Sequence, residues 1–400
     1  MNAAPRTLLV IANGHGEDAV AAMVVGELAR RAPWATVEAL PLVGEGGAIA
    51  RAGARLEGPR RELPSGGLTF HAWEHLRADL RAGIVALTAR QAAWLARARP
   101  DGVFVVGDFY AQLLACLVRA PRRVLQTLVS VHAAPPPSRP GRGRLTGRYF
   151  METFRGPELA LMRGADRVYA RDAATAGYLA GRGIAGASYV GNPVMDGLAA
   201  APLVPLGLRG RPTVGLLPGT RSWAPTSVAL MISALERLPG ALGLVAWANG
   251  QIPAPPPGWE SDLAPVPGVS VAWRRGPNRL WWVVERFAAV LASADVVLGT
   301  AGTGNEQAVG LGVPTVAFPV SPHLSSAFVA NQARLLGAGL TVGEPDAAAL
   351  AAHVTRLARD AGARARAAAA GSERMGGPGA SAALADELAT WLAALPPRAG

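Results

Sequence analysis

The chain has 400 residues, of which 50% are hydrophobic and 17% are charged, and its formal net charge at pH 7 is +11. This size predicts a globular protein with two or more domains. The longer apolar runs, such as 19–25 and 287–292, are too short to cross a bilayer as a helix. The positive charge favours an anionic partner. Among anionic partners nucleic acid ranks last and is not expected, because aromatic residues make up only 6% and no helix-turn-helix, zinc-finger or RNA-binding motif occurs.

Strand-like and helical segments alternate along the first half. The predicted strands are 7–12, 36–40, 103–106, 123–129, 167–170 and 188–190. The predicted helices between them are 18–31 and 74–97. This alternation indicates parallel strands with helices on both faces of the sheet.

The segment 199–212, AAAPLVPLGLRGRP, is rich in Pro and Gly and predicts a domain linker. Beyond it we expect strands at 213–217, 243–247, 269–273, 296–299 and 315–318, and helices at 226–238 and 280–292. The tail, 381–395, is typical of an amphipathic helix. The expected fold is α/β, with parallel sheets facing a central cleft. Its expected parts are an N-terminal Rossmann-like domain (1–198), the linker (199–212), a C-terminal Rossmann-like domain (213–380) and a helix returning to the first domain (381–400).

Two loops in the second half follow a strand and precede a helix. The first, in LLPGTR, contains Gly219, Thr220 and Arg221. The guanidinium of Arg221 can bind a phosphate through two parallel N–H groups, although an ordinary turn with a solvated arginine explains the loop equally well. The second loop consists of small and polar residues: Gly302, Thr303, Gly304 and Asn305. Such residues let backbone N–H groups at a helix N-terminus approach a diphosphate.

Glu306 begins the helix after the second loop. It can accept hydrogen bonds from a ribose diol, or it can simply pair with the helix dipole. No Asp-x-Asp pair occurs in the chain, so we expect Arg221 and backbone dipoles, and no metal, to compensate the diphosphate charge.

Four stretches, ANGHGED, VGNPVMDGL, LLPGTR and GTGNEQAVGLGVPTV, resemble in this order the GT-B glycosyltransferases and, among them, the lipid-A-disaccharide synthase-related proteins. The resemblance covers nearly the whole chain. It implies an inverting transferase that moves a hexosamine or hexose from a UDP-sugar, its co-substrate, to a lipid-linked or amphipathic acceptor without a cofactor. It also implies that Arg221 and residues 302–305 hold the UDP diphosphate and that Glu306 holds the ribose.

Asp108 follows the predicted strand 103–106 in VFVVGDFYAQ. By the resemblance, it corresponds to an aspartate of the synthase that is implicated in catalysis. A carboxylate at this position can accept the proton of an acceptor hydroxyl as the oxygen attacks C1 of the sugar. The alternative is an N-cap for a helix that starts near Tyr110.

The stretch VIANGHGEDAV has three interpretations. The first is a dinucleotide-binding fingerprint over 14–19, with Glu38 as the acid that binds the ribose. It is disfavoured because Glu17 and Asp18 would place negative charge against the pyrophosphate. A plain turn capped by Asn13 or Asp18 is the second. We favour the third, an acceptor loop similar to the Gly-Gly-His turn of the transferase that makes lipid II. In it, His15 is catalytic with Asp108, and the acceptor-binding residues are Asn13, Gly14, Gly16 and Asp18.

Related transferases place glutamines against the donor sugar at the segment where this chain has Ser321, His323, Ser325 and Ser326. Two other classes of protein stay open. One is an epimerase like UDP-GlcNAc 2-epimerase, and the other is a non-catalytic UDP-binding protein of the same fold.

Several features concern location and metal binding. HAWEH (71–75) fits a zinc pattern without a supporting third ligand, so we expect no metal site. The arginine-rich stretch 132–148 is either a loop that contacts a cytoplasmic membrane surface or a solvated loop. The predicted helix 74–97 either lies on that membrane surface or packs its apolar side in the core. The N-terminus lacks the features of a signal peptide, which predicts a cytoplasmic protein. The single cysteine, Cys116, stands in an apolar segment, which predicts a buried thiol and no disulfide.

Overall fold

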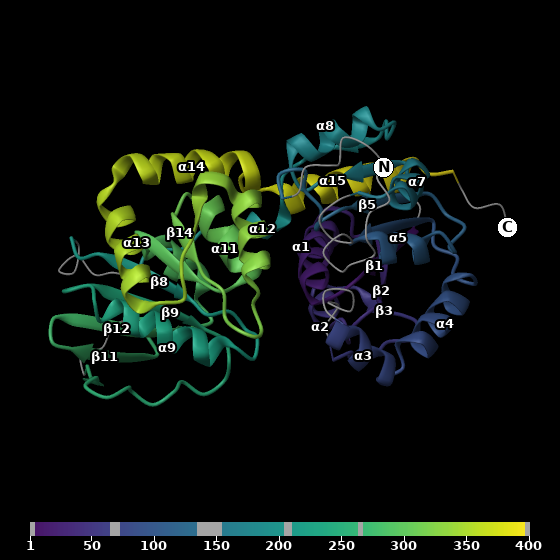
Figure 1. Ribbon diagram of the computed structural model, residues 1–400. Coiled ribbons are helices and arrows are strands. Elements are labelled where there is room, and N and C mark those ends of the chain that lie inside the picture. Colours follow the sequence, from purple (N-terminus) through teal and green to yellow (C-terminus); the bar gives the residue numbers. More distant parts are fainter. Residues whose placement is uncertain (1–4, 65–72, 134–153, 204–209, 263–266, 397–400) are drawn as a thin grey trace. The chain divides into compact units, whose positions relative to one another are not determined.

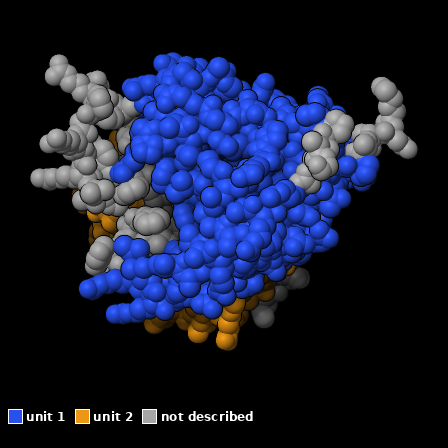
Figure 2. Space-filling view, turned by 90° about the vertical axis from the view of Figure 1, so that its right-hand side faces the viewer, with its two compact units in different colours: residues 1–196, 379–400 blue, residues 197–378 orange. Residues whose placement is uncertain are grey.

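The computed structural model describes residues 5–64, 73–133, 154–203, 210–262 and 267–396, with only the backbone described at 73–75. The chain forms two compact units (Figure 1). Unit 1 comprises 1–196 and 379–400, and unit 2 comprises 197–378. Figure 2 shows the atoms of unit 1 in blue and those of unit 2 in orange. Both units alternate strands and helices, which confirms the predicted α/β class.

Unit 1 contains a seven-stranded sheet among its described residues, in the order β3-β2-β1-β4-β5-β6-β7. All neighbouring strands are parallel. The strands are β1 (Arg6–Ala12), β2 (Ala35–Pro41), β3 (Arg55–Leu56), β4 (Gly102–Val106), β5 (Arg122–Leu125), β6 (Arg167–Tyr169) and β7 (Ala187–Ser188). The helices are α1 (His15–Arg31), α2 (Gly47–Arg51), α3 (Trp73–Arg81), α4 (Ile84–Leu95), α5 (Phe109–Ala115), α7 (Gly156–Arg163), α8 (Ala173–Gly181), the 3-10 turn η1 (Pro193–Met195) and α15 (Ala380–Ala394).

Side chains of β1 alternate between two hydrophobic cores, one on each face of the sheet. Leu8 and Val10 pack with α1 and α15. Leu9 and Ile11 pack with α4, α5 and α7. Burial on both faces is what a parallel sheet with helical crossovers requires.

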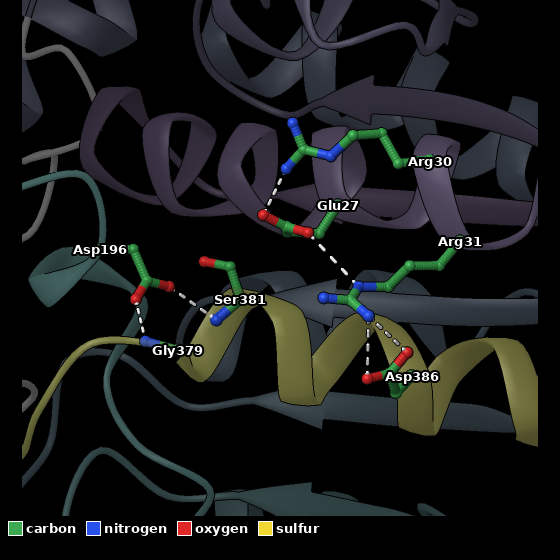
Figure 3. A network of polar contacts seen from close by, with 7 residues as sticks. All are labelled: Glu27, Arg30, Arg31, Asp196, Gly379, Ser381 and Asp386. Atoms are coloured by element: carbon green, nitrogen blue, oxygen red, sulfur yellow. Dashed lines mark hydrogen bonds and ion pairs between the residues drawn. The ribbon is translucent and has the colours of Figure 1, made fainter.

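The tail helix α15 belongs to unit 1, and polar contacts hold it there (Figure 3). The carboxylate of Asp196 accepts hydrogen bonds from the backbone N–H groups of Gly379 and Ser381. Farther along, Nη1 of Arg31 on α1 lies 3.0 Å from Oδ1 of Asp386. Gly191 lies against the start of the same helix, where a Cβ would come within 2.9 Å of Ala380 Cβ. The stretch VGNPVMDGL therefore holds the N-terminus of α15.

Unit 2 contains an eight-stranded sheet among its described residues, in the order β10-β11-β12-β9-β8-β13-β14-β15. It is parallel from β12 to β15, and β10 and β11 extend it in antiparallel fashion. The strands are β8 (Thr213–Leu217), β9 (Leu242–Trp247), β10 (Glu260–Ser261), β11 (Val271–Arg275), β12 (Asn278–Val284), β13 (Val296–Gly299), β14 (Thr315–Ala317) and β15 (Leu340–Val342). The helices are α9 (Ala224–Leu235), α10 (Phe287–Ser293), α11 (Gly302–Gly310), α12 (Ser326–Leu336), the 3-10 turn η3 (Gly337–Gly339), α13 (Ala347–Arg359) and α14 (Ala361–Met375).

Two predicted helices differ from the structure. The prediction of one helix over 280–292 was wrong, because its first part is the strand β12. Trp281 and Trp282 are both fully buried on successive positions of that strand, so both of its faces are apolar and no alternation marks it in the sequence. The predicted helix 74–97 is broken at Gly83, which has φ +85°, into α3 and α4.

Two smaller predictions were also wrong. The predicted strand 123–129 ends at Leu125, because the side-chain oxygen of Gln126 accepts hydrogen bonds from the N–H groups of Leu128 and Val129 and turns the chain. Cys116 is exposed just after α5 rather than buried, and its thiol donates to the Gln112 carbonyl oxygen at 3.3 Å. No described helix is long and apolar enough to cross a membrane.

Candidate functional site

In each sheet, successive strands are first added on one side of the first strand and then on its other side. The predicted site residues cluster at these two points of reversal. In unit 1 the chain runs outward from β1 through β2 to β3 and returns to β4 on the other side of β1. In unit 2 it runs outward from β8 and returns to β13 on the other side of β8. Ligands of open parallel sheets bind outside the carboxyl ends of the strands at such reversals. Both positions are therefore candidate binding sites.

In unit 1, the loop after β1 contacts the loop after β4. Asn13 Nδ2 donates a hydrogen bond of 2.8 Å to Asp108 Oδ1. The same oxygen accepts from the backbone N–H of Tyr110 at 3.0 Å, so Asp108 is the N-cap of α5. Gly107, with φ +143°, lets the loops approach, since a Cβ there would lie 3.0 Å from Asn13 Cβ. The structure thus brings together two predicted site residues and gives Asp108 a capping role.

His15 is the first residue of α1, and its side chain pairs with Glu62. His15 Nε2 lies 2.8 Å from Glu62 Oε1, and both side chains are about half exposed. Gly14 precedes it in extended backbone, and at Gly16 an added Cβ would meet no atom within 4 Å. The first turn of α1 therefore leaves His15 and Gly16 exposed. Glu62 had no sequence signal, because it stands 47 positions away from His15.

Carboxyl groups gather around Asp108. Burial and the nearby carboxyl of Asp108 raise the pKa of Glu17 to about 6. Burial and the carboxyls of Glu17 and Glu62 raise the pKa of Asp18 to about 7. Burial and Asp108 raise the pKa of Glu158, on α7, to about 7. These groups change their charge close to neutral pH, a property that suits proton transfer.

The pKa of Asp108 itself is also raised by burial, against the lowering effect of hydrogen bonds from the backbone of Tyr110 and Ala111. Gln126 Nε2 donates to Glu158 Oε1 at 2.9 Å and so fixes the carboxyl that faces Asp108. Nothing in the sequence pattern marks Gln126 or Glu158. Gln126 follows β5, which pairs with β4, and Glu158 is on α7, which contacts α5.

In unit 2, the loops after β8 and β13 are joined by hydrogen bonds. Thr300 Oγ1 donates to the Pro218 carbonyl oxygen at 3.1 Å. Asn249 Nδ2, after β9, donates to the Gly219 carbonyl oxygen at 2.7 Å. Gly219 has φ +79°, a conformation that suits glycine. The next residues, Thr220 and Arg221, are exposed, which leaves the guanidinium accessible to an anion.

The helix α11 begins at this position without a side-chain cap on its first N–H groups. Thr303 is exposed, and Gly302, Gly304 and Glu306 are partly buried. An uncapped N-terminus beside an arginine is an arrangement that binds phosphate groups.

Asn305 points into the protein. Its side chain is 1% exposed, and Nδ2 donates to the Gly299 carbonyl oxygen at 3.3 Å and to Gln332 Oε1 at 3.0 Å. Gln332 Nε2 in turn donates to the Gly302 carbonyl oxygen at 2.9 Å. The side chain of Asn305 therefore shapes the loop, and its backbone N–H remains the group that a ligand can use.

An aromatic pair stands beside the same two loops. The rings of Trp223 and His323 stack, with centroids 6.1 Å apart and planes inclined by 13°. Trp223 precedes α9, and His323 lies in the loop after β14. His323 lies in the segment where related transferases place glutamines against the donor sugar, whereas no motif marks Trp223.

Two predictions fall outside the described residues: the zinc pattern at 71–75, for which no side chain is described, and the greater part of the arginine-rich stretch 132–148. Within the described part of the chain, no group of His, Cys, Asp and Glu side chains has the arrangement of a metal site.

Comparison with known proteins identifies the fold. No family model and no curated protein matches the chain in sequence. Among solved structures, CalG4, the calicheamicin glycosyltransferase, is similar with a TM-score of 0.61 at 19% identity, over 98% of this chain and 99% of that one. MurG of Acinetobacter baumannii has a TM-score of 0.56 at 14% identity, over 96% and 100%. A UDP-N-acetylglucosamine 2-epimerase has a TM-score of 0.55 at 14% identity, over 96% of each chain.

These similarities extend over nearly the whole chain. Together with the two mainly parallel sheets, they establish the GT-B fold.

Proposed function

We propose that this protein is a UDP-sugar-dependent inverting glycosyltransferase related to the lipid-A-disaccharide synthases. The observation that carries the proposal is the loop pair at the reversal of the unit 2 sheet. There, Arg221 is exposed on a loop that is hydrogen-bonded to Thr300, and the N-terminus of α11 has no side-chain cap. A diphosphate is the ligand that this combination of a guanidinium and a helix N-terminus without a side-chain cap suits best. Neighbours of the same fold are named for glycosyl transfer.

The proposed mechanism assigns the acceptor to unit 1 and the donor to unit 2. The acceptor hydroxyl oxygen attacks C1 of the donor sugar, and the bond from C1 to the UDP oxygen breaks with its electron pair leaving on UDP. A carboxylate of unit 1, Asp108, takes the hydroxyl proton, while His15 orients the acceptor or shares that proton. Arg221 and the first N–H groups of α11 stabilise the charge that develops on UDP. Glu306 binds the ribose, and Asn13, Gly14, Gly16 and Asp18 hold the acceptor.

We propose a lipid-linked or amphipathic acceptor, presented at the cytoplasmic face of a membrane. Two large apolar side chains on successive helices, Leu80 of α3 and Val85 of α4, are 48% and 65% exposed. They lie near Arg81 and Arg90 in the sequence, a combination that favours an anionic lipid surface.

UDP binding tests the central claim. Isothermal titration with UDP is expected to give one site in the wild type and to lose about tenfold or more in affinity in Arg221→Ala, since a hydrogen bond to a charged group contributes about 1.5–3 kcal/mol. Arg237→Ala is the matched control, because Arg237 is also an exposed arginine of unit 2. Equal affinity in both variants contradicts the proposed diphosphate site.

The second candidate function is sugar-nucleotide epimerisation, favoured by the epimerase among the structural neighbours. Incubation with UDP-GlcNAc alone separates the two functions. An epimerase produces an isomer of the UDP-sugar, whereas a transferase releases UDP only when an acceptor is supplied. A non-catalytic UDP-binding protein gives neither product, and Asp108→Asn then changes nothing.

A further inference from the structure

His15 and Glu62 form a side-chain pair whose two members come from different loops of unit 1. His15 Nε2 lies 2.8 Å from Glu62 Oε1, and the two side chains are 49% and 56% exposed. A charged pair that is this exposed contributes little to stability, because water competes for both groups and both side chains lose freedom. The place of the pair is more informative, since His15 follows β1 at the reversal of the unit 1 sheet.

The backbone on either side of Glu62 is anchored. The carbonyl oxygen of Arg61 accepts a hydrogen bond from the N–H of Gly44 at 3.0 Å, and Nη1 of Arg61 donates to the Ala82 carbonyl oxygen at 2.8 Å. On the other side, Leu63 is buried in a small apolar cluster. The carboxylate therefore reaches the imidazole from a fixed point of the fold.

Gly44 lies beside the edge of the imidazole that contains Cε1 and Nδ1. A Cβ at this position would come within 3.1 Å of His15 Cε1, within 3.3 Å of His15 Nδ1 and within 3.5 Å of Glu62 Oε2. Gly44 also has φ +94°, a conformation that suits glycine. A glycine here thus leaves the Nδ1 edge of the ring uncovered, while Glu62 occupies Nε2.

This arrangement decides which ring nitrogen can act as a base. A carboxylate only accepts hydrogen bonds, so in the neutral imidazole Nε2 carries the proton and donates to Glu62, and Nδ1 keeps its lone pair. Nδ1 is then the atom that can accept a hydrogen bond from the hydroxyl of an acceptor. As the hydroxyl oxygen attacks C1 and gives up its proton, positive charge that develops on the imidazole is stabilised by the carboxylate of Glu62.

We propose that Glu62 is the positioning residue of His15, because it fixes the tautomer and the orientation of the imidazole and so presents Nδ1 to the acceptor. The inference rests on the proposed function, since it gives Glu62 a part in the reaction at the acceptor site. Asp108 is engaged elsewhere: its Oδ1 accepts from Asn13 Nδ2 and from the N–H of Tyr110. The proposed base and the partner of the histidine are therefore two different carboxylates.

The protonation of the ring gives a test that needs no substrate. The chain has six histidines, so labelling histidine alone with ¹⁵N gives a simple spectrum, in which His15→Gln identifies the signals of His15. At about pH 9, where histidine side chains are neutral, long-range ¹H–¹⁵N correlations are expected to show Nε2 protonated and Nδ1 unprotonated. In Glu62→Gln we expect part of the proton population to move to Nδ1, because an amide both donates and accepts. The matched control is Glu45→Gln, at another exposed glutamate of unit 1, which leaves these signals unchanged.

Kinetics show whether Glu62 acts through His15. UDP release is measured with UDP-glucose and UDP-GlcNAc as donors and octyl β-glucoside as an amphipathic acceptor. Glu62→Gln is expected to lower kcat by about 10- to 100-fold with little change in KM, since misplacing a reacting group costs up to about 10²-fold. Glu62→Asp keeps the carboxylate and should recover part of this loss. When His15→Ala is already present, Glu62→Gln should have no further effect.

The proposal is overturned if Nδ1 carries the proton in the wild type, if Glu62→Gln leaves the His15 signals unchanged, or if it slows the reaction as much beside His15→Ala as in the wild type. If these donors and this acceptor give no turnover, the NMR series decides alone. UDP binding is measured in parallel. A chain that does not bind UDP sinks the proposed function, whereas one that binds UDP while His15 does not respond to Glu62 sinks only this inference.

Discussion

Asp108 caps a helix and is also the proposed base, and two substitutions separate these roles. Asp108→Ala removes the acceptor for the Tyr110 N–H, at 3.0 Å, and for Asn13 Nδ2, at 2.8 Å. Loss of an N-cap costs about 1 kcal/mol. Asn13 is only 8% exposed, so its donor is left unpaired, at about 1–3 kcal/mol. The expected loss in the free energy of unfolding is about 2–4 kcal/mol.

Asp108→Asn keeps an oxygen where Oδ1 stands and removes the charge. Asparagine is as good an N-cap as aspartate, so we expect the free energy of unfolding to stay within about 1 kcal/mol of the wild type. Because burial raises the pKa of Asp108, the ionised carboxylate costs stability above that pKa, and the amide relieves this cost. At pH 8 Asp108→Asn is therefore expected to be at least as stable as the wild type.

Activity is expected to behave differently from stability. A general base contributes about 10²- to 10⁴-fold to the rate, so Asp108→Asn should lose that much in kcat while UDP binding in unit 2 is unchanged. Urea denaturation and UDP release by the same preparations supply both numbers. Full activity in Asp108→Asn refutes the assignment of the base and leaves the cap as the only role of Asp108. A large loss of stability in Asp108→Asn refutes the capping argument.

Three further outcomes follow from buried contacts. Below about pH 4.5 Glu158 is protonated in both the folded and the unfolded state. As the pH rises toward its raised pKa of about 7, the free energy of unfolding falls by up to about 3 kcal/mol, because ionisation costs more in the folded state. Glu158→Gln should therefore make the fall in Tm between pH 5 and 8 shallower, while the raised pKa values of Glu17 and Asp18 preserve part of that fall. Asn305→Ala leaves Gln332 Oε1 unpaired and should cost about 1–3 kcal/mol in urea denaturation. Trp391→Ala, which removes the buried indole of α15 and its bond to Asp166, should cost about 3–5 kcal/mol, and a loss below 1 kcal/mol contradicts that packing.

Most strands were predictable because each is a short apolar run that ends at a glycine, proline or polar residue. The runs 103–106, 213–217 and 296–299 are confirmed within one residue. The segment 280–292 failed for a physical reason: in a strand buried on both faces, every position is apolar, and a buried helix has the same composition.

The candidate site residues that the sequence predicts are those that directly follow a strand. Asn13, Asp108, Gly219 and Thr303 all stand within a few positions of a strand end, and strand ends are visible in the sequence. Glu62, Glu158 and Gln126 were missed, because each contacts a partner that is distant in the sequence and that only the tertiary fold brings close. Partners 47 or 32 positions apart leave no local pattern.

The two sheet reversals carry opposite charge, and this difference argues for different ligands. In unit 2, the reversal has an exposed arginine and uncapped N–H groups, which suit an anion. In unit 1, the same topological position has a helix N-terminus whose first turn holds Glu17 and Asp18, with Asp108 beside it. These carboxylates occupy the place where a phosphate would otherwise be attracted by the helix dipole. A duplicated nucleotide site is thereby disfavoured in unit 1, which agrees with the proposed binding of the UDP-sugar in unit 2.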